Sequence, residues 1–134
     1  MKSNKIIKNE PFVSIIIINF NGGDIIHECI NSIYETVMNR FEIILIDNKS
    51  SDNSSEKCKE KWPEIKLIQN EENIGLTARN IGIKESKGEF IVFLDSDTVV
   101  TNGWLENLIQ SFKENGDGLY QPKLLEKNRP DVIN

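Results

Sequence analysis

Four short apolar runs alternate with segments of helical periodicity, and this alternation restricts the fold more than any other feature of the sequence. Val13–Asn19 is a nearly continuous β-branched run, the pattern of a strand buried on both faces. Similar runs follow at Phe41–Ile46, Ile65–Gln69 and Glu89–Leu94. Strands that alternate with helices in units of about 30 residues predict an α/β domain with a doubly wound, mostly parallel sheet.

The segments between these runs carry apolar residues at helical spacing. The first such segment has them at Ile25, Ile26, Cys29, Ile30, Ile33 and Val37. A weaker helix is expected to end at Trp62, because Pro63 cannot continue it. A third helix is predicted over Leu76–Ser86 and a fourth from Trp104 to Phe112, with one more strand around Leu119–Lys123.

The size and charge of the chain limit what it can bind. A chain of 134 residues allows one α/β domain with a single core. The formal net charge of -5 argues against a broad nucleic-acid surface, which needs clustered Lys and Arg. It does not exclude an anionic ligand, because a divalent cation can supply the missing positive charge.

Two further features bear on the compartment. The longest apolar run, Phe12–Phe20, is shorter than the ~20 residues that a membrane-spanning helix needs. Cys29 and Cys58 lack CxxC spacing and have no histidine cluster nearby, so we interpret them as reduced thiols of a cytoplasmic protein. We expect residues 1–10 to be an N-terminal extension that precedes the domain of residues 11–134.

Polar residues follow each predicted strand, where ligands of open α/β sheets bind. We therefore expect Asn19–Gly23, Asp47–Asp52, Asn70–Gly75 and Asp95–Thr98 to share one edge of the sheet. The strongest signal is Asp95-Ser96-Asp97, directly after a buried run. Two carboxylates at i and i+2 suit Mg²⁺ or Mn²⁺, and a metal held there can clamp a diphosphate. The alternative is an acidic turn that caps the helix near Trp104.

The other strand-end residues each have a functional and a structural interpretation. Asp47 and Asn48 could read the edge of a nucleobase, or they could form an Asx-turn or a helix cap. Phe20, beside Asn21, could stack on a base, or it could be a core residue next to a glycine turn. Arg79 could pair with a phosphate, or it could be an ordinary surface arginine.

These segments in this order resemble the inverting family 2 glycosyltransferases of the GT-A fold. The resemblance begins at Pro11–Gly22 (PFVSIIIINFNG) and continues through Ile44–Asp52, which contains IDN followed by Ser50 and Asp52. It then includes Asn70, Asn73–Gly75 and Ala78–Ile83, and it ends with Gly88–Thr98. The resemblance extends over about residues 11–112, most of the chain.

The resemblance implies transfer of a sugar, with inversion, from a UDP- or dTDP-sugar to a saccharide or lipid-linked acceptor. It places the base and ribose near the end of the first strand, the diphosphate near Arg79, and Mn²⁺ or Mg²⁺ on Asp97 and Asp95. The dTDP alternative comes from Asp47-Asn48, which looks like the rhamnosyltransferase-like branch. The implied nucleotide-sugar residues are Asn19, Phe20, Asn21, Asp47, Asn48, Gly75, Arg79, Asp95, Ser96 and Asp97.

The resemblance also implies a catalytic carboxylate well downstream of Asp97, because inverting transfer needs a base to deprotonate the acceptor. Glu126 and Asp131 follow Asp97, but neither matches the expected pattern. We therefore leave the catalytic residue unassigned and expect it beyond residue 134, in the missing part of a longer glycosyltransferase domain. Relatives that build surface polysaccharides suggest a cytoplasmic location, with peripheral association at the inner face of the membrane as an open alternative.

Two other functions remain in competition. Phe93–Val99 fits the hhhhDxDxV pattern of haloacid-dehalogenase-type phosphatases, in which Asp95 would be the nucleophile and Asp97 the general acid. Those enzymes usually carry the motif on an N-terminal strand, whereas here it comes late. A non-catalytic nucleotide-sugar-binding module is the second alternative, and binding without turnover would distinguish it.

Overall fold

The computed structural model describes residues 11–37, 40–126 and 128–133. The predicted extension of residues 1–10 lies outside these ranges. By its internal contacts the chain divides into two compact units, residues 1–100 and residues 101–134. The first unit contains the parallel sheet and all the strand-end segments that the sequence singles out.

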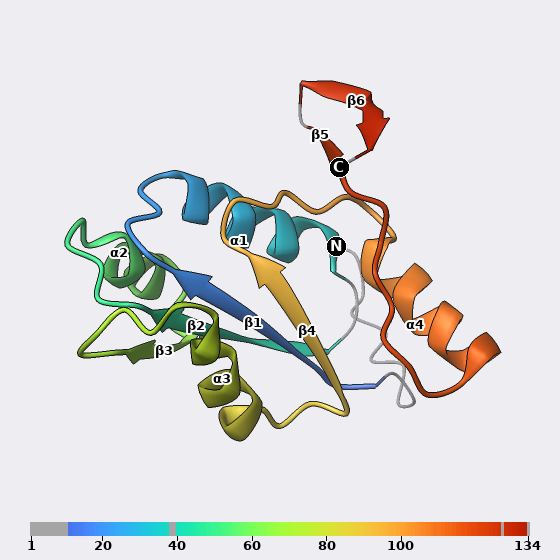
Figure 1. Ribbon diagram of the computed structural model, residues 1–134, viewed down its shortest axis with the longest axis horizontal. Coiled ribbons are helices and arrows are strands. Elements are labelled where there is room, and N and C mark those ends of the chain that lie inside the picture. Colours follow the sequence, from blue (N-terminus) through green and yellow to red (C-terminus); the bar gives the residue numbers. More distant parts are fainter. Residues whose placement is uncertain (1–10, 38–39, 127, 134) are drawn as a thin grey trace, which may run out of the picture. The chain divides into compact units, whose positions relative to one another are not determined.

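The sheet of the first unit consists of four parallel strands in the order β3-β2-β1-β4 (Figure 1). Their bounds are Val13–Asn19 for β1, Phe41–Asp47 for β2, Lys66–Gln69 for β3 and Phe90–Asp95 for β4. Val13 pairs with Phe41 on one side and with Phe90 on the other, so β1 is an interior strand. The parallel sheet predicted from the sequence is confirmed.

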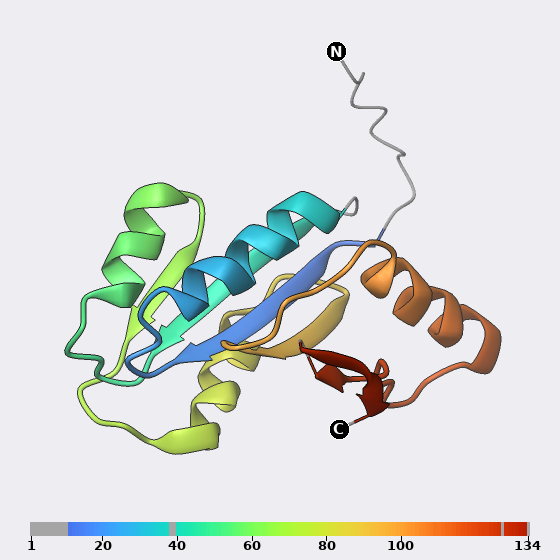
Figure 2. The same cartoon turned by 90° about the horizontal axis from the view of Figure 1, so that it is seen from above.

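Helices cover both faces of this sheet. Figure 2 shows α1 (Ile25–Thr36) and α2 (Ser54–Lys61) on one face, and α3 (Arg79–Glu85) on the other. The helix predicted at Leu76–Ser86 is in the right place, but its first turn is the 3₁₀ helix η1 (Gly75–Ala78). The Thr77 hydroxyl donates to the Ile74 carbonyl there, and 3₁₀ turns are frequent at the N-termini of α-helices.

The core lies between these layers and consists mainly of branched aliphatic side chains. The fully buried ones include Ile15, Ile16, Ile17, Ile26, Ile30, Ile33, Ile44, Leu45 and Ile46. Helix α3 approaches β1 closely at Gly82, where a Cβ atom would lie 2.5 Å from Cγ2 of Ile16. The continuous apolar runs of β1 and β2 therefore reflect burial on both faces.

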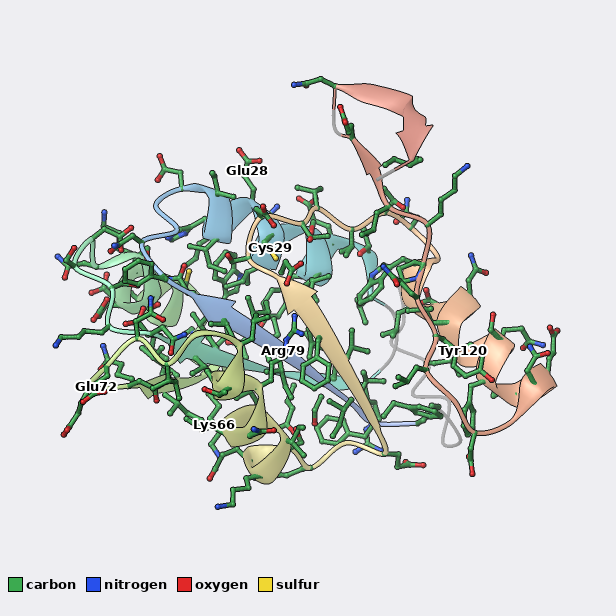
Figure 3. All side chains as sticks on the ribbon, viewed as in Figure 1. Glu28, Cys29, Lys66, Glu72, Arg79 and Tyr120 are labelled. Carbon is green, nitrogen blue, oxygen red and sulfur yellow. The ribbon has the colours of Figure 1, made fainter. Side chains whose placement is uncertain are left out.

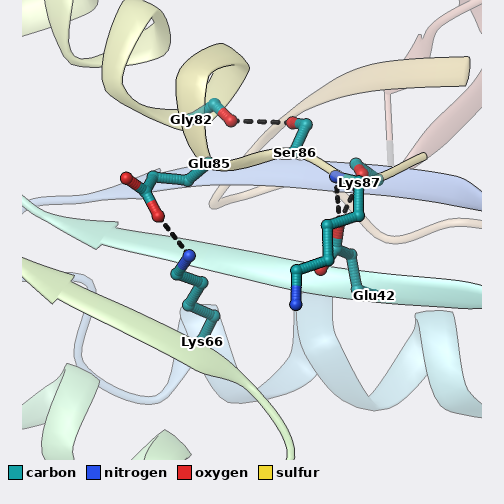
Figure 4. A network of polar contacts seen from close by, with 7 residues as sticks. Glu42, Lys66, Gly82, Glu85, Ser86 and Lys87 are labelled. Atoms are coloured by element: carbon teal, nitrogen blue, oxygen red, sulfur yellow. Dashed lines mark hydrogen bonds and ion pairs between the residues drawn. The ribbon is translucent and has the colours of Figure 1, made fainter. Parts of the chain in front are cut away.

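Polar contacts join α3 and the following loop to the sheet (Figure 4). Lys66 of β3 forms an ion pair with Glu85 of α3. Glu42 Oε1 accepts hydrogen bonds from the Ser14 hydroxyl at 2.6 Å and from the Lys87 backbone N–H at 2.7 Å. These contacts fix the entry to β4, the strand that ends at Asp95.

The second unit contains α4 (Trp104–Asn115) and an antiparallel pair, β5 (Leu125–Glu126) and β6 (Arg129–Ile133). The strand predicted at Leu119–Lys123 is wrong, since those residues form no strand and pairing begins only at Leu125. Pro122 lies within the predicted stretch and has no N–H to donate to a ladder. Among the described residues, no helix is long and apolar enough to cross a membrane.

Candidate functional site

The carboxyl ends of all four parallel strands lie at one edge of the sheet, as the sequence predicts (Figure 1). Backbone hydrogen bonds continue the contact beyond the strands. The Asn48 N–H donates to the Asn19 carbonyl at 2.8 Å, and the Asn70 N–H donates to the Asp47 carbonyl at 2.8 Å. The segments after β1, β2 and β3 are thereby held side by side.

Asn19 and Asp47 form a buried polar network with the start of α2. Asn19 Nδ2 donates to Ser54 Oγ at 2.7 Å and to Ser55 Oγ at 2.8 Å. Asp47 Oδ1 accepts from Ser55 Oγ at 2.5 Å, and its Oδ2 accepts from the Ser50 N–H at 2.8 Å. Both side chains are almost completely buried. The network fixes the ends of β1 and β2 against α2, and the predicted contact of these residues with a nucleobase stays a prediction.

Asn48 is also buried, and it holds the loop after β3. Its Nδ2 donates to the Gly75 carbonyl at 3.1 Å, and its Oδ1 accepts from Asn70 Nδ2 at 2.8 Å. Gly75 has a φ of 59°, a conformation that favours glycine. Asn48 therefore closes the Asn70–Gly75 loop from both ends.

The segment after β1 packs against the turn before α2. The Asn21 N–H donates to Ser50 Oγ at 2.9 Å, and Asn21 Oδ1 accepts from the Ser51 N–H at 2.8 Å. Phe20 is 53% exposed, so its interpretation as a core residue is wrong. An exposed aromatic ring at a strand end remains available to stack on a planar ligand.

Asp52 anchors the same two segments through its carboxylate. Oδ2 accepts from the Gly23 N–H at 2.9 Å, and Oδ1 accepts from the Ser54 hydroxyl at 2.6 Å. The bond from the Ser54 hydroxyl is the largest cause that lowers the pKa of Asp52, because it stabilises the charged form.

Asp95 and Asp97 lie at the end of β4 with exposed side chains. The Thr98 N–H donates to the Asp95 carbonyl at 3.0 Å, which closes a turn around Ser96 and Asp97. Arg79 Nη2 lies 3.4 Å from Asp95 Oδ1, and Figure 3 shows the arginine side chain between α3 and β4.

The surroundings of this ion pair are partly apolar. The Arg79 guanidinium carbon lies 5.2 Å from the centre of the Phe93 ring. A hollow at this place is lined by Ile16, Ile18, Leu76, Arg79, Leu94, Asp95 and Ser96. The Arg79, Asp95 and Asp97 side chains at and near the end of β4 all retain access to solvent.

The chemistry of Asp95 and Asp97 fits a hard divalent cation, because carboxylate oxygens are the ligands that Mg²⁺ and Mn²⁺ prefer. The described part of the chain contains no group of three or more His, Cys, Asp and Glu side chains that could hold a metal. The N-cap of α4 is Gly103, without a side-chain cap among the described residues, so the helix-cap interpretation of the two aspartates is wrong.

Two residues behind this turn are not evident from the sequence. Cys29 and Ser32 of α1 are buried and contact Asp95 and Val100, respectively. Burial raises the pKa of the Cys29 thiol to about 12, so it is protonated at neutral pH. Both cysteines are free thiols, as predicted. The one sequence feature that could have identified Ser32 is its polar side chain among the apolar residues of a predicted helix.

The comparison with protein families identifies the family of the chain. The sequence model of glycosyl transferase family 2 matches residues 14–132. The chain belongs to this family. The match includes β1 from Ser14 onward, the other three parallel strands and the Asp95–Asp97 turn. It therefore favours the glycosyltransferase interpretation of the two aspartates over the haloacid-dehalogenase interpretation.

Several curated glycosyltransferases are similar in sequence. The glycosyltransferase GlyG of Streptococcus pneumoniae is 33% identical over 106 residues, which are 76% of this chain and 35% of that protein. The poly(ribitol-phosphate) beta-N-acetylglucosaminyltransferase TarP of Staphylococcus aureus is 35% identical over 113 residues, 80% of this chain and 35% of TarP. The chain thus spans about a third of the length of these relatives.

Solved structures confirm the GT-A fold. The mannosyltransferase PcManGT from Pyrobaculum calidifontis, in complex with GDP-Man and Mn²⁺, has a TM-score of 0.71 and 25% identity, covering 77% of this chain and 32% of that chain. S. aureus TarS 1–349 in complex with UDP-GlcNAc has a TM-score of 0.67 and 24% identity, and the match covers 87% of this chain and 41% of that chain. Both are GT-A glycosyltransferases.

Proposed function

We propose that this chain is the donor-binding part of a glycosyltransferase that transfers a sugar, with inversion, from a nucleoside-diphosphate sugar to a saccharide or lipid-linked acceptor. The observation that carries the proposal is the Arg79–Asp95 ion pair at the carboxyl edge of a parallel sheet, with the exposed Asp97 two residues further along the chain. Membership of glycosyl transferase family 2 supports the reaction class.

The charges at this edge explain why a metal is part of the proposal. A diphosphate carries several negative charges, and Arg79 supplies only one positive charge. The chain as a whole has a formal net charge of -5. A Mn²⁺ or Mg²⁺ ion held by Asp97 and Asp95 would bridge the carboxylates and the phosphates, and when bound it stabilises charge on the leaving diphosphate. The Mn²⁺ in the PcManGT structure supports this choice.

The base of the donor would lie toward β1 and β2. Phe20 is exposed there and can stack on a planar ring, while Asn19, Asp47 and Asn48 shape the surrounding backbone. UDP and dTDP are the nucleotides that the family resemblance suggests, and GDP is added because the PcManGT structure contains GDP-Man. We also propose a cytoplasmic location, which the two free thiols support, with peripheral association at the inner face of the membrane as the alternative.

Calorimetric titration of UDP, dTDP and GDP, each with Mn²⁺ or with EDTA, tests the donor site. We expect nucleotide binding to depend on Mn²⁺. We also expect Asp97→Asn to raise the Kd by more than roughly tenfold, the effect of losing a residue that only supports a metal ligand. Asp117→Asn is the matched control, because Asp117 is exposed and belongs to the other unit.

The alternative outcomes are distinct. Failure of the folded wild-type chain to bind any of the three nucleotides contradicts the proposed donor site. Equal weakening by the control variant would indicate a non-specific charge effect. Hydrolysis of an aryl phosphate that Asp95→Asn abolishes would instead support the phosphatase alternative, and sugar transfer by this chain alone would contradict a base beyond residue 134.

A further inference from the structure

Two neighbouring side chains of α1 hold both ends of the segment that carries the aspartates. The Cys29 thiol donates to the Asp95 carbonyl with an S···O distance of 3.6 Å. The hydroxyl of Ser32 accepts a hydrogen bond of 3.1 Å from the Val100 backbone N–H. Figure 3 labels Cys29 on α1 close to the end of β4. The segment Asp95–Val100 is therefore attached to one helix at its first and last residues.

Ser32 is an unusual residue for its position. It is 5% exposed and lies on the buried face of α1, among Ile26, Ile30 and Ile33. Serine is a poorer helix former than alanine, and a buried hydroxyl costs free energy unless it is hydrogen-bonded. Here the hydroxyl donates to the Cys29 carbonyl at 2.7 Å and accepts from Val100, so its donor and one acceptor position are both used.

Cys29 completes the attachment from one helical turn away. Residues at i and i+3 share a helix face, so Cys29 and Ser32 point toward the same segment. The Asp95 carbonyl accepts from the Cys29 thiol and also from the Thr98 N–H at 3.0 Å. The turn that contains Asp97 is thus closed on itself and bound to α1, while the Asp97 side chain stays exposed.

We propose that Cys29 and Ser32 are positioning residues, which hold the backbone of Asp95–Val100 so that the two aspartate carboxylates face the donor diphosphate and its metal before either binds. This inference rests on the proposed donor site. A segment ordered in advance binds more tightly, because less conformational entropy is lost on binding. Helix α1 would then contribute to donor affinity without touching the donor.

The test combines local hydrogen exchange with nucleotide titration. Backbone exchange measured by NMR should be about tenfold faster at Val100 in Ser32→Ala, which removes one buried hydrogen bond. In Cys29→Ala the amide that exchanges faster should be that of Thr98, because its N–H donates to the same Asp95 carbonyl as the Cys29 thiol. Each variant should raise the Mn²⁺-dependent Kd of the nucleotide by about tenfold, and Cys29→Ser should retain more affinity because it keeps a donor.

Ser86→Ala is the matched control for Ser32→Ala. Its hydroxyl donates to the Gly82 carbonyl at 2.7 Å in the same helical manner, but Ser86 lies at the end of α3, on the other face of the sheet (Figure 4). We expect no change in the exchange of Val100 or in the Kd. Slow exchange of the β1 and β2 amides in every variant shows that the fold is retained.

Each other result overturns the proposal in a recognisable way. Unchanged exchange at Val100 and Thr98 means that α1 does not hold the segment. Faster exchange with an unchanged Kd means that the attachment exists but does not position the aspartates. If the wild-type chain binds no nucleotide, the proposed function fails and the positioning role fails with it, while the exchange rates still show whether the attachment exists.

Discussion

The polar side chains at the strand ends fall into two groups that differ in burial. Asn19, Asp47 and Asn48 are buried, and their side chains form hydrogen bonds with neighbouring loops and with the start of α2. Asp95 and Asp97 are exposed and keep carboxylate oxygens in contact with solvent. Substitution in the first group should change stability, whereas substitution in the second should change ligand affinity, because buried groups cannot recover their lost partners from water.

Asp47→Asn tests the buried group. The substitution replaces one carboxylate oxygen by an NH₂ group, which would face either the Ser50 N–H or the Ser55 hydroxyl. Against the Ser50 N–H, the NH₂ group would place two donors face to face. Against the Ser55 hydroxyl, it would also meet Asn19 Nδ2, a donor that lies 3.4 Å from Asp47 Oδ1. Each orientation loses a hydrogen bond, so we expect the free energy of unfolding to fall by about 1–3 kcal/mol in urea denaturation. Asp117→Asn should change it by less than about 0.5 kcal/mol. Equal stability of the two variants would show that the network around Asp47 contributes nothing.

Asp52 gives the site a dependence on acid. Its pKa is lowered from the ordinary 3.8, chiefly by the hydrogen bond from the Ser54 hydroxyl. A lowered folded-state pKa contributes stability above the unfolded-state value, and this contribution disappears as the pH falls through the folded-state value. Urea denaturation should therefore show the stability advantage of wild type over Asp52→Asn shrinking below about pH 4. The effect is small because the carboxylate is partly exposed, and an advantage that stays constant down to about pH 2 would contradict it.

At the scale of elements, the close contact between α3 and β1 depends on the absence of a side chain at Gly82. A Cβ atom on Gly82 would lie 2.5 Å from Cγ2 and 2.9 Å from Cδ1 of Ile16, which is itself buried. Because Arg79 is the first residue of α3, the fit of this helix on the sheet also sets the position of the arginine beside Asp95.

Gly82→Ala should therefore destabilise the protein by about 1–3 kcal/mol, although alanine is the better helix former, because overpacking outweighs propensity here. Thermal or urea denaturation measures the change. Gly118→Ala is the control, since the nearest atoms to its Cβ would be side-chain atoms of Tyr120 at 3.6 Å or more, an ordinary van der Waals distance. A stabilised Gly82→Ala variant would mean that α3 can move away from β1 at no cost.

The sequence predicts the strands and helices of the parallel sheet well, because their signals are local. Each apolar run becomes a strand with bounds that shift by one residue or less, as at Phe90–Asp95. The 3₁₀ turn at Gly75–Ala78 is missed because helical periodicity does not distinguish the first turn of an α-helix from a short 3₁₀ helix. The false strand at Leu119–Lys123 could have been avoided, since Pro122 is visible in the sequence.

The candidate site is predictable in outline but not in its internal contacts. The rule that ligands bind beyond the carboxyl ends of parallel strands identifies the right edge. Which residues there are buried depends on side-chain directions across neighbouring strands, as for Asn19 opposite Asp47. The contacts of Cys29 with Asp95 and of Ser32 with Val100 join positions that are 66 and 68 residues apart in sequence, so no local pattern reveals them.

At the scale of the whole molecule, charge and length determine which step of the reaction this chain can be used to test. The net charge of -5 and the anionic donor repel each other, which makes a divalent cation an expected part of binding at low ionic strength. The chain spans about a third of the length of its relatives, so these predictions concern donor binding rather than turnover.

The interior position of β1 has a consequence for the protein during its synthesis. Val13–Asn19 leaves the ribosome first among the strands, yet one of its edges pairs only with Phe90–Asp95. Until that last strand is synthesised, the isoleucines of β1 keep an open edge that other chains can join. Biosynthesis of this protein therefore includes an interval of exposure to aggregation, and translation speed between β2 and β4 sets its length.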